Sequence, residues 1–214
     1  MNKQNADTVV VLDYETTGLS PEQGDRGIEI GAVLLENGKV TDRFQALMNP
    51  GFRVSAFIED YTGISNVMLS TAGSCEGATR DFAQFIGNYN LVAHNASFDR
   101  RFLDAEMRRA KSSYDGDFAC SMLAARRLYP EAYNHQLGTL VQHRNLDNNG
   151  VFHRALADAE MTALLWLDML ELLGTKHQLS NVPFKTMQQL TRTPKGNLAK
   201  FYLRKAAEHS HTTA

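Results

Sequence analysis

The most constraining feature of the sequence is the apolar run from Val9 to Leu12, which ends in the acidic residues Asp13 and Glu15. Four consecutive Val and Leu residues are typical of a strand that is buried on both faces in a parallel or mixed sheet. Side chains two apart on a strand share a face, so both carboxylates should project from the same side. Two such charges repel each other unless a cation lies between them. The stretch fits a metal site or a solvated acidic turn about equally, and the rest of the chain has to decide.

The composition predicts one domain, or one domain with an extension. The chain has 214 residues, of which 43% are hydrophobic, and this is enough for a sizeable core. No apolar run reaches the roughly 18 residues of a membrane span, and residues 1–7 contain no apolar signal region. The only cysteines are Cys75 and Cys120, so we expect no disulfide framework. A cytoplasmic protein with no membrane partner is therefore expected.

The charge of the chain is unevenly distributed. The formal net charge is −2, but residues 176–214 contain seven Lys or Arg residues and one acidic residue, Glu208. Such asymmetry between segments indicates contact with a polyanion, although a solvated basic tail explains it equally well.

The order of the elements predicts an α/β fold. Asn37-Gly38 is a strong hairpin signal between a strand at 28–35 and a strand at 39–48. Further along, short strands at 91–93 and 117–120 alternate with helices. This pattern predicts a mixed sheet of about five strands flanked by helices. The helices are expected at 55–61, 76–86, from 97 onward, 121–129, 136–144 and from about 153 to 173.

The last part of the chain is predicted to be helical as well. Residues 183–190 and 196–207 each fit a short helix, and the second of these mixes apolar with basic positions. We therefore divide the chain into a main domain at 1–174 and a basic helical extension at 175–214.

Further polar residues follow at element boundaries. Asp99 comes soon after the strand at 91–93, and His153 and Asp158 lie where the helix ending near 173 begins. Ligands bind outside the carboxyl ends of parallel strands, so Asp13, Glu15, Asp99 and Asp158 should converge. Two divalent cations would balance four carboxylates, and two-metal sites serve in-line displacement at phosphorus. A nearby imidazole could take a proton from an attacking water.

Three motifs in this order resemble those of the DEDDh, or DnaQ-like, family of 3′–5′ exonucleases. They are the Asp-x-Glu of residues 13–15, the His-Asn-x-x-Phe-Asp of residues 94–99 and the His-x4-Asp of residues 153–158. The resemblance spans about residues 8–172. It implies a ribonuclease H-like fold and hydrolysis of phosphodiester bonds from the 3′ end, with release of nucleoside 5′-monophosphates.

The resemblance also implies a role for each matching residue. Asp13 matches the carboxylate that bridges two metal ions, Mg²⁺ or Mn²⁺. Glu15 and Asp158 match the positions that complete the shell of metal ligands and water. Asp99 matches the carboxylate of the second metal, and His153 matches the general base.

Substrate-binding positions are expected around these motifs. In the family, the turn after the first motif embraces the terminal nucleotide, which implies Thr16, Gly18 and Leu19 here. Ile64 lies in a Thr-Gly-Ile stretch that is similar to the family's His-Gly-Ile. Within the second motif, His94 and Phe98 are further candidates, although a structural role is favoured for both, His94 in the motif loop and Phe98 in the core.

Two questions stay open at the level of sequence. Residues 92–101 and 125–130 look more like DNA exonucleases of the exonuclease X and epsilon type than like oligoribonuclease, so DNA is favoured over RNA as the substrate. The alternatives are an exoribonuclease similar to ribonuclease T, a proofreading-type subunit that docks on a polymerase or another replication or repair partner, and a non-catalytic nucleic-acid-binding module. The last is disfavoured because no motif residue is missing.

Overall fold

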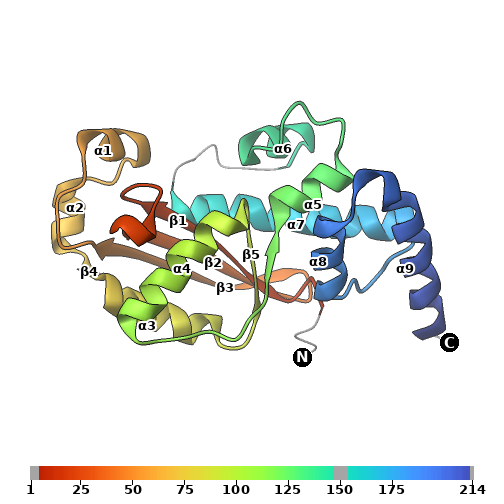
Figure 1. Cartoon of the computed structure of the whole chain (residues 1–214), viewed down its shortest axis with the longest axis horizontal. Coiled ribbons are helices and arrows are strands. Elements are labelled where there is room, and N and C mark those ends of the chain that lie inside the picture. Colours follow the sequence, from red (N-terminus) through yellow and green to blue (C-terminus); the bar gives the residue numbers. More distant parts are fainter. Residues whose placement is uncertain (1–4, 147–153, 213–214) are drawn as a thin grey trace.

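The structure is a computed structural model that describes residues 5–146 and 154–212, with side chains described as far as Glu208. A central mixed sheet is covered by helices on both faces (Figure 1). The strand order is β4-β3-β2-β1-β5-β6, with β1 in the interior of the sheet. This confirms the predicted α/β class and the central place of the first strand.

The sheet combines an antiparallel meander with parallel strands. β1 pairs antiparallel with β2 and parallel with β5, so both edges of β1 are hydrogen-bonded. The sheet has one strand more than the five predicted, because the two-residue β4 pairs with the end of β3. The strands are β1 (Val9–Thr16), β2 (Gly27–Glu36), β3 (Lys39–Asn49), β4 (Gly73–Ser74), β5 (Asn90–Ala93) and β6 (Phe118–Cys120).

Nine α-helices lie in the described ranges, and none of these is long and apolar enough to cross a bilayer. Two short 3-10 turns, Pro21–Gln23 and Lys195–Asn197, accompany them. The helices are α1 (Ala56–Thr62), α2 (Asn66–Thr71), α3 (Cys75–Ile86), α4 (Ala96–Ala110), α5 (Ser121–Leu128), α6 (Leu137–His143), α7 (Ala155–His177), α8 (Phe184–Arg192) and α9 (Leu198–Thr212).

β1 is buried on both faces, as its apolar run predicts. Val9 and Val11 pack into the core under α5, α7 and α8, whereas Val10 and Leu12 pack into the core under α3 and α4. All four side chains are fully buried. Because alternate residues face opposite sides, Asp13 and Glu15 continue the face of Val9 and Val11, which is the face that α7 covers.

The predicted hairpin is also confirmed. Asn37 and Gly38 connect β2 to β3 with φ of 51° and 75°. Both values lie in the left-handed region, which Asn and Gly tolerate better than other residues and which two-residue hairpins of this type require.

The C-terminal helices pack onto the main core. α7 continues past Gly174 to His177, so the expected boundary at residue 174 lies inside this helix. Phe184 and Met187 of α8 and Phe201 of α9 belong to the same buried cluster as Trp166. The backbone N–H of Ala6 donates to the Val182 carbonyl at 2.8 Å, so the segment after α7 also contacts the start of the chain.

Candidate active site

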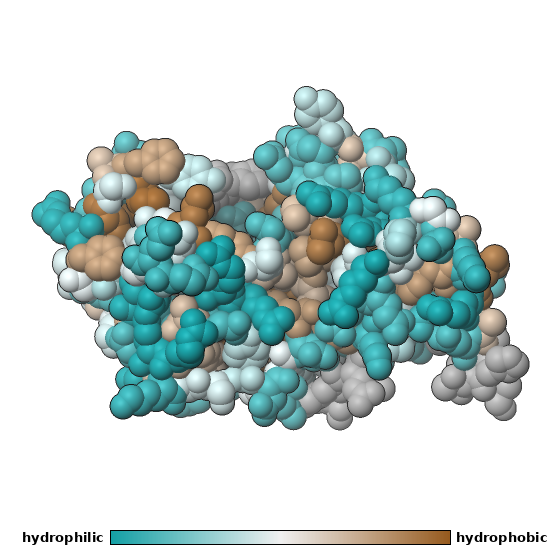
Figure 2. Space-filling view, viewed as in Figure 1, coloured by the Kyte–Doolittle hydropathy of each residue, from teal (hydrophilic) through white to brown (hydrophobic). Residues whose placement is uncertain are grey.

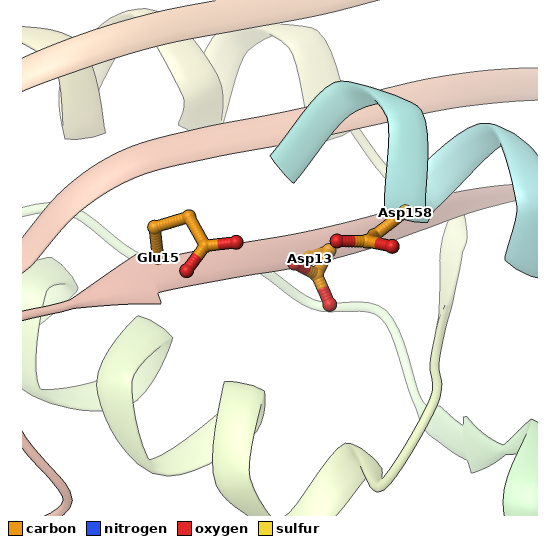
Figure 3. Close-up of side chains that lie close together, drawn as sticks. All are labelled: Asp13, Glu15 and Asp158. Atoms are coloured by element: carbon orange, nitrogen blue, oxygen red, sulfur yellow. The ribbon is translucent and has the colours of Figure 1, made fainter. Parts of the chain in front are cut away.

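Three carboxylates come together where β1 ends and α7 begins. Asp13 and Glu15 project from β1, and Asp158 lies in the first turn of α7 (Figure 3). Each of them offers one oxygen, and these atoms all lie within 4.8 Å of one another. Residues 145 positions apart in sequence thus form one acidic cluster, as the motifs predict.

The close approach of α7 to the sheet depends on Gly31. This residue lies on β2 directly opposite Asp13 of β1. A Cβ atom at position 31 would lie 2.0 Å from the backbone nitrogen of Leu156 and 2.2 Å from the carbonyl carbon of Ala155. A side chain of any size would therefore push the first turn of α7, which carries Asp158, away from the strands.

An ion pair between a buried carboxylate and a partly exposed guanidinium fixes the start of the same helix. Glu29 is fully buried on β2, opposite Glu15, and accepts from Arg154 Nε at 3.0 Å and Nη2 at 2.7 Å. It also accepts from the backbone N–H of Ala155 at 3.1 Å, which is one of the N–H groups that a helix start leaves unpaired. Gln45 of β3 donates to Glu29 at 2.9 Å. Glu29 thus links the sheet to the N-terminus of α7.

Asp99 reaches the site from α4. It lies in the first turn of that helix, is 2% exposed, and accepts a hydrogen bond from the backbone N–H of Tyr14 at 3.2 Å. Tyr14 lies between Asp13 and Glu15 in the sequence, so this bond places the Asp99 carboxylate beside the same stretch of β1. The Asp99 oxygens are not among the carboxylate oxygens that lie within 4.8 Å of one another. Asp99 therefore lies beside the cluster of Asp13, Glu15 and Asp158 and is not part of it.

The cluster is electrostatically strained. Burial, followed by the nearby charges of Asp99, Asp158 and Glu15, holds the pKa of Asp13 well above its usual range. Burial and the charge of Asp158 raise the pKa of Glu15 to about 8. Burial likewise raises the pKa of Asp99 to about 7, although the hydrogen bond from Tyr14 works in the opposite direction. Each shift disfavours the ionised form of the carboxyl group, chiefly because burial removes that group from water.

This donor set fits a hard divalent cation. An octahedral Mg²⁺ holds oxygens at ~2.1 Å, so its ligand atoms lie about 3 to 4.2 Å apart. The oxygens of Asp13, Glu15 and Asp158 lie within a comparable distance of one another. Carboxylate oxygens are also the ligand type that Mg²⁺ and Mn²⁺ prefer. A bound cation would favour the ionised form of these carboxylates.

The predicted general base cannot be placed. His153 lies outside the described residues, which resume at Arg154. Its role stays a prediction from the sequence.

The turn after β1 holds three predicted substrate contacts. Thr16 Oγ1 donates to the Gly18 carbonyl at 2.7 Å, which closes the turn. A Cβ on Gly18 would lie 2.4 Å from Asp25 Oδ2, and this carboxylate also accepts from Ser20 N. Gly18 is therefore required by internal packing, whether or not a ligand approaches it. Leu19 is 73% exposed, as expected for a side chain that contacts a ligand.

The other three predicted contacts are less accessible. Ile64 is fully buried with Ile28, so its side chain is part of the core and offers no surface to a nucleotide. Phe98 is half-buried and packs against Phe102, with ring centroids 5.0 Å apart. His94 uses both ring nitrogens, with Nδ1 2.8 Å from Ser121 Oγ and Nε2 2.9 Å from the His135 carbonyl. These positions favour structural roles for His94 and Phe98.

The motifs miss three residues that position the site: Gly31, Glu29 and Arg154. One of them leaves a signal in the sequence, because Glu29 interrupts an otherwise apolar strand and a buried carboxylate needs a partner. The identity of that partner, 125 positions away, could not be read from local pattern.

Comparison with known proteins agrees with this geometry. A family model described as Exonuclease matches residues 10–166. The 3′-5′ exonuclease DinG of Bacillus subtilis (strain 168) is 37% identical over 193 residues, which are 90% of this chain and 20% of that protein. The DNA polymerase III subunit epsilon of Aquifex aeolicus (strain VF5) is 30% identical over 175 residues, which are 81% of this chain and 86% of the relative.

A solved structure shares the fold over most of its length. Exonuclease X in complex with 5′ overhanging duplex DNA superposes with a TM-score of 0.68 and 28% identity. The match covers 86% of this chain and 99% of the other.

Proposed function

The chain belongs to the exonuclease family whose model matches residues 10–166, and on that premise we propose that it is a metal-dependent 3′–5′ exonuclease. It would hydrolyse phosphodiester bonds from the 3′ end of DNA, at single-stranded or frayed ends, and release nucleoside 5′-monophosphates. The observation that carries this proposal is the cluster of Asp13, Glu15 and Asp158, which joins carboxylates of the first and third motifs, with Asp99 of the second motif beside it. This chain matches only 20% of the length of the DinG protein, so the proposal covers the exonuclease activity alone and not the other activities of that longer protein.

Two divalent cations, Mg²⁺ or Mn²⁺, are proposed as cofactors. Asp13 would contact both, Glu15 and Asp158 would complete the shell of one, and Asp99 would hold the other. When bound, such ions polarise the phosphoryl oxygens and activate water for in-line attack. The buried carboxylates support this assignment, because a bound cation would favour the ionised forms that burial disfavours.

The chain's own contribution is to position these ligands and to move a proton. β1 and its neighbours are rigidly hydrogen-bonded on both sides, and Glu29 with Arg154 fixes the start of α7. His153 precedes Arg154 in sequence and is proposed as the general base that accepts a proton from the attacking water. Leu19, which is exposed in the turn after β1, is proposed to wedge against the terminal base.

DNA is proposed as the substrate because the relatives named above include a DNA polymerase III subunit and an exonuclease solved with duplex DNA. A polymerase or repair partner is proposed on the likeness to the epsilon subunit alone. A cytoplasmic setting is proposed because Cys75 and Cys120 are both free thiols.

The test is a time course on matched 5′-labelled single-stranded DNA and RNA with Mg²⁺, Mn²⁺ or EDTA. We expect a ladder that shortens from the 3′ end of the DNA and disappears with EDTA. Asp13→Asn should abolish this ladder, and His153→Ala should slow it by about 10²-fold or more. Asp115→Asn, which removes an exposed carboxylate before β6, is the control and should leave the rate unchanged.

The same assay can refute each part. A ladder on RNA alone would replace DNA by RNA as the substrate. Full activity of Asp13→Asn would exclude the two-metal assignment, and activity of His153→Ala within a few-fold of the unsubstituted protein would exclude this residue as the base.

A further inference from the structure

A cavity of about 510 Å³ lies between α8 and α9, away from the carboxylate cluster. Three cationic side chains line it: Arg192 at the end of α8, and Lys200 and Arg204 on α9. The cavity wall also includes the side-chain amides of Gln189 and Asn197 and the ring of Phe201. Among the lining residues that the structure describes, none is acidic.

These cations have little internal compensation. Within the described ranges, Arg192 and Lys200 form no ion pair. Arg204 lies 3.7 Å from Glu208, but Lys205 is closer to the same carboxylate, at 2.8 Å. The Arg204 and Glu208 side chains are 60% and 54% exposed, and water screens exposed pairs of this kind so that they contribute little. The cavity therefore keeps a positive potential.

The surrounding segment strengthens this potential. Residues 184–208 contain six Lys or Arg residues and a single acid, Glu208. Asn197 ends the 3-10 turn that precedes α9 and Lys200 lies in the first turn of α9, so the cavity borders the start of this helix. In Figure 2 the surface over α8 and α9 alternates hydrophilic with apolar side chains, unlike the more apolar surface over α1 and α2.

The position of the cavity relative to the active site is set by α7. This helix carries Asp158 in its first turn and His177 at its end (Figure 1). Nineteen residues of helix span ~28 Å. The His177 ring stacks on Tyr202 of α9 with centroids 3.7 Å apart, and Tyr202 is adjacent to Phe201 of the cavity wall. The cavity thus lies on the order of 30 Å from the carboxylates, or about nine base pairs of duplex.

We propose that this cavity is a second nucleic-acid contact, at which Arg192, Lys200 and Arg204 hold a phosphodiester of the DNA upstream of the 3′ end. The choice of DNA as the ligand rests on the proposed function. The site itself is new, because none of the three motifs contains its residues. Guanidinium and ammonium groups suit phosphate oxygens, and the amides of Gln189 and Asn197 can donate to them. Such a contact would add affinity for long substrates and none for very short ones.

The test compares a 20-base-pair DNA duplex with a three-nucleotide strand that cannot reach from the carboxylates to the cavity. The variant carries Arg192→Gln, Lys200→Gln and Arg204→Gln together. Its control carries Lys39→Gln, Arg80→Gln and Lys111→Gln, which remove the same charge from exposed positions outside the basic C-terminal segment that do not line the cavity. Binding of the duplex is followed by fluorescence anisotropy in EDTA over a salt series, and cleavage of the short strand is followed with Mg²⁺.

We expect the cavity variant to bind the duplex about tenfold or more weakly at moderate salt. The slope of log K against log salt should fall in magnitude by about 2 to 3, or close to one for each single substitution. Cleavage of the three-nucleotide strand should be unchanged. The control variant should move the duplex affinity and the slope much less.

Two results would overturn the proposal. One is a duplex affinity and salt slope that match those of the control variant. The other is an equal loss on the long and the short substrate, which would show a general effect on the fold or the active site. Because duplex binding is measured without metal, a protein that binds in this way but cleaves nothing would refute the proposed exonuclease activity and leave the second contact standing.

Discussion

His94 shows how a motif residue can serve the fold. Its Nε2 faces the His135 carbonyl, which can only accept, so this nitrogen carries the proton. Its Nδ1 lies 2.8 Å from Ser121 Oγ, and the Ser121 hydroxyl also donates to the Ala93 carbonyl at 3.2 Å. Burial is the main reason that the pKa of His94 falls to about 4, and it outweighs the opposing effect of the His135 carbonyl.

The lowered pKa of His94 predicts a specific loss of stability in acid. Between about pH 6.5 and 4 the unfolded chain binds a proton at this residue and the folded chain does not, so the free energy of unfolding decreases as the pH falls. The decrease is at most about 1.4 kcal/mol per pH unit. The free energy of unfolding in urea can be measured for the unsubstituted protein and for His94→Gln across this pH range. It should depend more steeply on pH in the unsubstituted protein than in the variant. Parallel curves would contradict a buried neutral ring.

At the scale of elements, the contact between β2 and α7 decides the geometry of the site. Asp13 and Glu15 are fixed by β1, whereas Asp158 is brought to them only because the first turn of α7 lies directly on Gly31. The Glu29 carboxylate holds the same turn through Arg154 and Ala155. The acidic cluster therefore depends on two elements that are joined by backbone contact and by the ion pair of the buried Glu29 with Arg154.

Gly31→Ala should uncouple these two elements. The new methyl group would need space that the backbone of Ala155 and Leu156 fills, so α7 and Asp158 must shift from Asp13. A displacement near 1 Å is enough for a ~10²-fold loss of turnover, and the Mg²⁺ concentration for half-maximal activity should rise. The measurement is a Mg²⁺ titration of exonuclease activity.

The control for this substitution is Gly73→Ala, because a Cβ on Gly73 would meet nothing within 4 Å. It should behave like the unsubstituted protein. If Gly31→Ala keeps its turnover and its metal dependence, the approach of α7 to β2 does not set the site.

The sequence predicts what is encoded locally and misses what is not. The strand β1, its acidic end and the Asn37-Gly38 turn follow from neighbouring residues, and the structure confirms them. Residue 29 is an acid in a buried strand, but its partner lies 125 positions away and no local pattern names it. Gly31 is one of 15 glycines, and only the packed helix shows why it must be small. Ile64 was placed in the site by resemblance, yet its side chain is core.

At the scale of the whole molecule, the main domain and the C-terminal extension differ in their charge but share one hydrophobic core. Trp166 belongs to the first part, and its indole nitrogen donates to the Ala6 carbonyl at 2.7 Å. Phe184 and Met187 of the second part lie in the same buried cluster as Trp166. Shared packing of this kind predicts that both parts unfold together.

Phe184→Ala tests this cooperativity. Phe184 is 2% exposed, so its truncation should lower the free energy of unfolding by about 3–5 kcal/mol. Fluorescence of Trp166, the only tryptophan, reports on the main domain, and far-UV circular dichroism reports on all helices. In urea both signals should shift by the same amount with one midpoint. The control is Leu203→Ala on α9, at a side chain that is 75% exposed. It should change the free energy of unfolding by less than about 0.5 kcal/mol. A Trp166 transition that Phe184→Ala leaves in place would instead show that residues 175–214 unfold independently of the main domain.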